Sequence, residues 1–187
     1  MTVTNPLEHT FGQLWTIDDL ATLPSDGNRY EIFDGSLLVS PHADVTHGAA
    51  SIKLHRILTL QAPADLCVGH DLGVSRKITS YLVPDLFVVR AEALGKRDAT
   101  LDPATISLVG EVLSPGNRGR DLVLKRYEYA AAGIPTYWIV DPAERSMRVL
   151  ELELDGDAYR EAETVRPGSA WSTTRPFPLS FDLADVF

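Results

Sequence analysis

The chain has 187 residues, of which 44% are hydrophobic and 23% charged, as in ordinary soluble globular proteins. Its net charge of −9 argues against a protein that simply coats nucleic acid, because phosphate contacts dominate that kind of affinity. The single cysteine, Cys67, excludes an internal disulfide and a metal-binding cysteine cluster, and it suits a reducing cytoplasm. Apolar runs far shorter than ~20 residues predict no membrane span, and residues 1–10 do not resemble a secretory signal.

The first half of the chain predicts a hairpin, a long helix and several strands. An Asp34-Gly35 turn between two apolar runs predicts the hairpin. Apolar residues at helical spacing before Pro63 predict a helix over 47–61. The other expected elements are a short capped helix at 16–20 and strands at 66–69, 73–78, 82–90 and 106–113.

The second half predicts a helix over about 117–132, closed by Gly133, and a strand at 136–141. A second hairpin follows at 147–154 and 158–163, and the tail ends in a single turn. This order predicts an α/β fold with a mixed central sheet flanked by helices and with added N- and C-terminal β-hairpins. We expect one domain over 1–187, with its core at about 29–142 and the C-terminal hairpin and tail at 143–187.

Three charged residues stand in otherwise apolar elements. Asp85 opens one predicted strand, Glu111 lies inside another, and Lys125 follows in the next helix. A buried carboxylate needs a partner, because burying it alone is very costly, and a metal is one such partner. Two carboxylates and an ammonium can hold Mg²⁺ and a phosphate beside an attacking water. Taken singly, Asp85 also reads as a solvated strand end and Lys125 as an exposed helix residue, so the signal lies in their order and context.

The charge is unevenly distributed along the chain. Residues 141–187 hold ten acidic and five basic side chains, whereas residues 115–126 are basic. The basic run contains Arg118, Arg120, Lys125 and Arg126 against Asp121 alone. Such a short run also fits a solvated helix face. If DNA binds, we expect it to contact this basic run, with the acidic hairpin between Glu151 and Glu163 turned away from the DNA.

The order of Pro84-Asp85, Glu111 and Lys125 resembles the restriction-endonuclease-like fold with its PD-(D/E)xK signature. More closely, the chain resembles the Uma-two family of putative restriction endonucleases. One departure from the superfamily pattern is Leu113, which stands where a lysine two residues after the glutamate is expected; the family implies that Lys125 replaces it. The matching pieces span about 29–142 and are Tyr30–Gly35, Ser40-Pro41 with His47, Pro84–Leu86, Glu111–Pro115, Asp121-x-x-x-Lys125-x-x-x-Tyr129 and Gly133–Pro142.

The resemblance implies a role for each matching residue. Asp85 and Glu111 would ligate Mg²⁺ or Mn²⁺, with the Val112 carbonyl as a third ligand. Lys125 would orient or help to deprotonate the attacking water and neutralise the phosphate. Glu31 would be a further acidic ligand, or else a charged residue on the exposed face of a hairpin.

Further residues are candidates for contact with the substrate. His47 would touch phosphate or metal, or else serve as a helix cap or surface residue. Arg118 and Arg120 would contact DNA. Tyr129 is interpreted as a packing residue.

The leading hypothesis is a metal-dependent endonuclease that acts on DNA. The alternative is a degenerate module of the same fold that binds nucleic acid or a protein partner, which Leu113 and the acidic surface favour. A metal-dependent hydrolase of a smaller substrate has no positive signal. Phosphate loops, dinucleotide fingerprints, nucleophile elbows and His-Glu-x-x-His helices are absent. A homodimer is left open.

Overall fold

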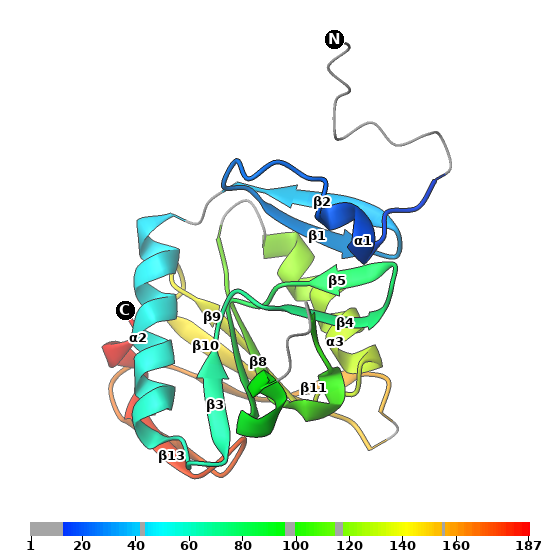
Figure 1. The fold of residues 1–187 in the computed structure, drawn as a ribbon. Coiled ribbons are helices and arrows are strands. Elements are labelled where there is room, and N and C mark those ends of the chain that lie inside the picture. Colours follow the sequence, from blue (N-terminus) through cyan, green and yellow to red (C-terminus); the bar gives the residue numbers. More distant parts are fainter. Residues whose placement is uncertain (1–12, 42–43, 96–99, 115–117, 155) are drawn as a thin grey trace.

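A six-stranded mixed sheet forms the centre of the structure, a computed structural model that describes residues 13–41, 44–95, 100–114, 118–154 and 156–187. The strand order is β11-β10-β9-β8-β6-β3, in which β8 and β9 are parallel and every other pair is antiparallel. Figure 1 shows the long helix α2 along one side of this sheet. The strands are β3 (Leu66–Gly69), β6 (Leu86–Arg90), β8 (Ile106–Val112), β9 (Thr136–Asp141), β10 (Ser146–Leu152) and β11 (Tyr159–Val165).

A second, smaller sheet lies at the top of the view in Figure 1. Its order is β2-β1-β5-β4-β7, and the β1–β2 hairpin turns through Asp34 (φ 46°) and Gly35 (φ 79°). Two consecutive positive φ angles are what a tight hairpin turn requires, so the Asp-Gly signal is confirmed. The strands are β1 (Arg29–Phe33), β2 (Ser36–Ser40), β4 (Gly73–Lys77), β5 (Ser80–Leu82) and β7 (Thr100–Leu101).

The central strands of the large sheet, β6, β8 and β9, are buried on both faces, which explains their nearly continuous apolar sequences. Successive side chains alternate between the faces. Val88 and Trp138 pack with Leu54 of α2 (Val45–Gln61) and with the C-terminal segment. Val89 and Ile139 pack on the other face with residues such as Tyr129 of α3 (Arg126–Ala131).

The C-terminal segment is more structured than the expected single turn. It forms a hairpin of β12 (Ala170–Thr173) and β13 (Leu179–Asp182), followed by a 3₁₀ turn at Leu183–Asp185. Buried Phe181 and Leu183 explain why this segment folds against the sheet face that α2 also covers. A short helix, α1 (Ile17–Leu20), precedes the first hairpin as predicted.

Two predicted elements are wrong in detail, and both errors concern the site. The predicted strand 82–90 is broken at Val83–Asp85, where the chain passes from β5 in the small sheet to β6 in the large one. Pro84 cannot donate to a ladder, which accounts for the break. The predicted helix 117–132 is π-helical at η3 (Arg120–Lys125) before α3 begins.

Candidate active site

The break at Val83–Asp85 brings groups from both sheets and two helices together. Lys125, at the end of η3, is buried to 3% exposure. Its Nζ lies 2.9 Å from Glu111 Oε1 and 3.0 Å from Glu31 Oε1. The Val83 carbonyl accepts a longer bond from the same nitrogen, at 3.4 Å. Lys125 therefore points toward the carboxylates, as expected, and joins β1, β8 and the break.

Glu31 is held from a second side as well. The Val83 backbone N–H donates to Glu31 Oε1 at 2.9 Å, and the residue is 2% exposed. The interpretation of Glu31 as a charged residue on an exposed hairpin face is therefore wrong. A carboxylate this deeply buried is stabilised by its ion pair with Lys125 and by the backbone donor.

Asp85 sits where the break meets β6, with its carboxylate bound on both oxygens. Arg29 Nη1 donates to Oδ1 at 2.6 Å. His47 Nε2 and the Val112 backbone N–H both lie 2.8 Å from Oδ2. Burial opposes ionisation of this group, but the His47 hydrogen bond and the charges of Arg29 and Lys125 outweigh it, so the pKa of Asp85 lies well below its ordinary value. Asp85 is therefore an anion across the physiological range.

Arg29 is a site residue that the sequence reasoning did not single out, and Tyr129, interpreted there as a packing residue, also contacts the site. Burial disfavours the charged form of Arg29, but the carboxylates of Asp85, Glu111 and Glu31 raise the pKa of its guanidinium. Tyr129 Oη donates to Glu111 Oε1 at 2.8 Å. Burial and the nearby charge of Glu111 hold the pKa of Tyr129 well above its usual value, so its phenol stays a donor. For Tyr129, the signal was its spacing of four residues from Lys125.

These residues form a charge cluster of Arg29, Glu31, Asp85, Glu111 and Lys125. With three carboxylates against two cations, the cluster carries an excess of one negative charge while His47 is neutral. His47 Nδ1 is buried without a hydrogen-bond partner. A further cation near the carboxylates would balance the excess charge.

The donor chemistry of the cluster fits a hard divalent cation. Mg²⁺ takes oxygen donors, and it is usually bound by one or two carboxylates with several waters. Asp85 and Glu111 supply two such carboxylates from neighbouring strands, since Leu86 pairs with Gly110 in the β6–β8 ladder. Among the described residues, no three His, Cys, Asp or Glu side chains are grouped to hold a metal ion.

The arginines predicted to bind the substrate differ in their contacts in the structure. Arg118 Nη2 lies 2.7 Å from Asp141 Oδ2, so it is tethered to the end of β9. The side chain of Arg120 lies outside the described residues. Arg126 donates to the Tyr159 carbonyl. Lys125 is buried, so the exposed basic face expected to include it is wrong in that respect.

Leu113 is buried among apolar residues on the sheet face against which Tyr129 of α3 packs. It follows Glu111 by two residues, and its backbone N–H donates to the Val140 carbonyl at 2.8 Å. In this structure, the ammonium near Glu111 comes from the helix and not from the strand.

The described helices include none that is long and apolar enough to cross a membrane.

The chain is similar to known proteins in its fold and in its sequence family. A solved structure described as a "putative nuclease belonging to DUF820", from Anabaena variabilis ATCC 29413, superposes with a TM-score of 0.71 at 17% identity, covering 92% of this chain and 97% of that one. This likeness shows that the two chains share one fold. No curated protein matches the chain. The model of the Uma-two family, described as "Putative restriction endonuclease", matches residues 17–185, and the chain therefore belongs to that family.

Proposed function

We propose that this protein is an endonuclease that hydrolyses phosphodiester bonds of DNA with the help of Mg²⁺ or Mn²⁺. The observation that carries the proposal is the buried Lys125–Glu111 pair beside Asp85. Buried ion pairs seldom improve stability over an apolar replacement, so such a cluster is a candidate for function. Family membership supports the same class of reaction.

Each residue has a role in this proposal. Asp85 and Glu111 would hold the metal, with the Val112 carbonyl as a third ligand. A bound metal lowers the pKa of its water and offsets charge on the phosphate. Lys125 would orient the attacking water and neutralise the phosphate, while Glu31 and Tyr129 keep the ammonium and Glu111 in place. Arg29 and His47 would fix the carboxylate of Asp85.

The test is a plasmid-nicking assay with Mg²⁺ or Mn²⁺, run beside metal titration by calorimetry. Glu111→Gln removes a charge at nearly constant shape and should abolish nicking and weaken metal binding. Glu163→Gln is the matched control, since Glu163 is exposed on β11 and bonds Trp171. Nicking by the Glu111→Gln variant at the parent rate would refute the proposal.

A second candidate is a binding module of the same fold without catalysis. The observation that favours it is that the charged groups of the site already have partners within the protein: Arg29 and Lys125 are paired with the three carboxylates, and Arg118 is paired with Asp141. In that case, DNA affinity persists without strand cleavage under any divalent ion. The nicking assay and a binding assay on the same sample separate the two functions.

A further inference from the structure

A pocket of about 430 Å³ opens beside Asp85, between α2 and the segment that precedes β4. Four of its residues, Gly48, Ser51, Ile52 and His55, recur at the spacing of one helical face of α2. The opposite wall is His70-Asp71, and Arg29, His47 and Asp85 close the end toward the charge cluster. The pocket is therefore continuous with the proposed active site.

The volume sets the size of the occupant. Pockets for small ligands span about 300–1,000 Å³, so this one suits a single compact group. A duplex presents its bases inside two stacked strands and cannot place one base in a pocket without unpairing it. A single-stranded or locally unpaired segment places a base there at far lower cost.

The chemistry of the walls favours a nucleobase over a second phosphate. His47, His55 and His70 contribute flat rings, and the His55 and His70 rings meet edge to face at 5.4 Å. Such rings, with the exposed apolar side chain of Ile52, are surfaces on which bases stack. The charges are Arg29, already bound to Asp85, and the carboxylates of Asp85 and Asp71. This acidic balance repels a phosphate but not a neutral base.

The rim offers polar groups for the edge of a base. Asp71 has a left-handed backbone (φ 55°), and its exposed carboxylate bonds His70 Nδ1 at 2.8 Å and lies 3.5 Å from Arg29 Nη2. Its remaining acceptor capacity matches an exocyclic amino group, which cytosine, adenine and guanine carry and thymine lacks. Ser51 supplies a hydroxyl on the opposite wall.

We infer that this pocket binds an unpaired nucleobase next to the bond to be cut, so that the substrate is single-stranded or locally unpaired DNA. The statement that the base lies next to the bond to be cut rests on the proposed function. The statement that the pocket binds an unpaired base depends only on binding.

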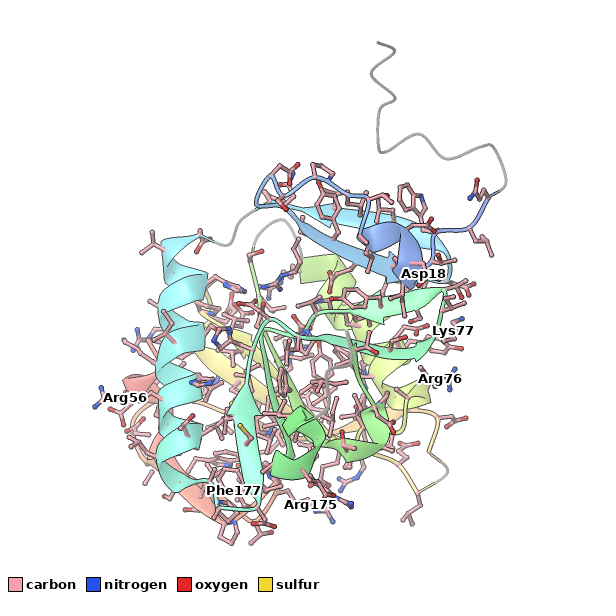
Figure 2. The ribbon with its side chains drawn as sticks, viewed as in Figure 1. Asp18, Arg56, Arg76, Lys77, Arg175 and Phe177 are labelled. Atoms are coloured by element: carbon pink, nitrogen blue, oxygen red, sulfur yellow. The ribbon has the colours of Figure 1, made fainter. Side chains whose placement is uncertain are left out.

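Gly48 provides the sharpest test, because a Cβ built there meets no atom within 4 Å. Gly48→Phe should fill the pocket without a clash in the helix. Gly48→Ala controls for the helix propensity gained when glycine is replaced. Arg56→Ala controls for a substitution on α2 outside the pocket, since Arg56 points away from the body of the protein (Figure 2).

The measurement is fluorescence anisotropy with labelled 12-mers, single-stranded dC, single-stranded dT and a duplex, without divalent cation so that binding is read apart from cleavage. The parent should bind the dC strand about ten-fold more tightly than the dT strand or the duplex. Gly48→Phe should lose that preference, Gly48→Ala, which adds a single methyl group, should reduce it much less, and Arg56→Ala should stay within two-fold of the parent. Thermal unfolding checks that each variant is folded. If Gly48→Phe does not fold, His70→Ala should lower dC affinity about ten-fold through lost stacking.

The outcomes separate the pocket from the nuclease. Equal binding of single strand and duplex, or an unchanged preference in a folded Gly48→Phe variant, would overturn the pocket even if plasmid is nicked. Gly48-dependent binding of the single strand with no cleavage of any DNA under Mg²⁺ or Mn²⁺ would support the pocket and refute the nuclease.

Discussion

Lys125 is the side chain on which the candidate site depends most. Its ammonium compensates two buried carboxylates, so its removal leaves uncompensated negative charge inside the protein. Breaking a buried pair in this way costs about 3–5 kcal/mol. We predict that Lys125→Met lowers the free energy of unfolding by about that amount, as measured by urea denaturation at pH 7.

A matched control is Lys77→Met. Lys77 bonds Asp34 at 2.7 Å, but its side chain is 41% exposed, and it lies at the outer end of β4 (Figure 2). An exposed pair contributes less than about 1 kcal/mol, so this variant should unfold like the parent. Equal losses of unfolding free energy in both variants would show that the buried ion pair contributes no more to stability than the exposed one.

Asp85 gives the stability a defined pH dependence. Its pKa in the folded protein is lowered. The stabilising contribution of its ionised carboxylate is therefore fully present above the pKa of an aspartate in the unfolded chain, about 3.9, and is lost as the pH falls below that value. We predict that Asp85→Asn flattens the dependence of unfolding free energy on pH between about 5 and 3. Urea denaturation at pH 7, 5, 4 and 3 measures this.

Asp34→Asn is the control for that series, since Asp34 is exposed at a hairpin turn where asparagine also accepts a positive φ. It should keep the pH slope of the parent. A parent slope retained in the Asp85 variant would mean that other carboxylates cause the acid sensitivity.

Among the elements, those with strong periodicity or turn chemistry were predictable from the sequence. The Asp34-Gly35 turn, the buried strand at Ile106–Val112 and the end of α3 at Gly133 follow local rules that packing does not override. Gly133 has φ 75°, and the Ile134 N–H donates to the Tyr129 carbonyl at 3.1 Å. These features depend only on neighbours in the sequence.

The features missed depend on contacts between distant segments. Tyr127 is exposed although it is aromatic, while Lys125 and Tyr129 on the same helical segment are buried. The wider π-helical turn rotates the residues that follow it, and no local pattern predicts such a turn. Arg29 was missed because its partner, Asp85, is 56 residues away. The apolar character of Phe181 indicated that it would be buried, but it did not indicate against which sheet its strand would pack.

The strand and helix positions of the ammonium are predicted to be interchangeable. Leu113 lies on the same sheet face as Glu111, two residues further along the chain. Leu113→Lys alone should destabilise, because it buries a second ammonium in an apolar cluster. In the Lys125→Met background the same change should be less costly, because its ammonium then compensates Glu111.

A double-mutant cycle of unfolding free energies measures this coupling, which we expect to be favourable and in the range of about 0.5–3 kcal/mol. Leu101→Lys in the Lys125→Met background is a control, since Leu101 is a buried member of the same cluster outside the site. Additive losses at Leu113 would show that an ammonium on the strand cannot reach Glu111.

For the molecule as a whole, the net charge of −9 has to be reconciled with the polyanionic substrate proposed above. The acidic residues are concentrated toward the C-terminus, where β11 exposes its five central residues. Several arginines that would meet phosphate are already paired within the protein, Arg118 with Asp141 and Arg126 with the Tyr159 carbonyl. If the substrate is DNA, as proposed, its phosphates must compete with these internal partners, which predicts modest affinity and a small number of phosphate contacts.

Arg118 tests this competition. Its side chain is 46% exposed, so a phosphate can reach it while Asp141 holds it in place. Loss of one phosphate contact lowers the slope of log affinity against log salt by about 0.7 for a single strand and 0.9 for a duplex. We predict that decrease for Arg118→Ala, whereas Arg175→Ala should keep the parent slope, since Arg175 lies near β13 at the far end of α2 (Figure 2). Asp141→Asn, which releases Arg118, should raise DNA affinity. Identical slopes for parent and Arg118→Ala would exclude Arg118 from the DNA interface and leave the pocket beside Asp85 as the main point of contact.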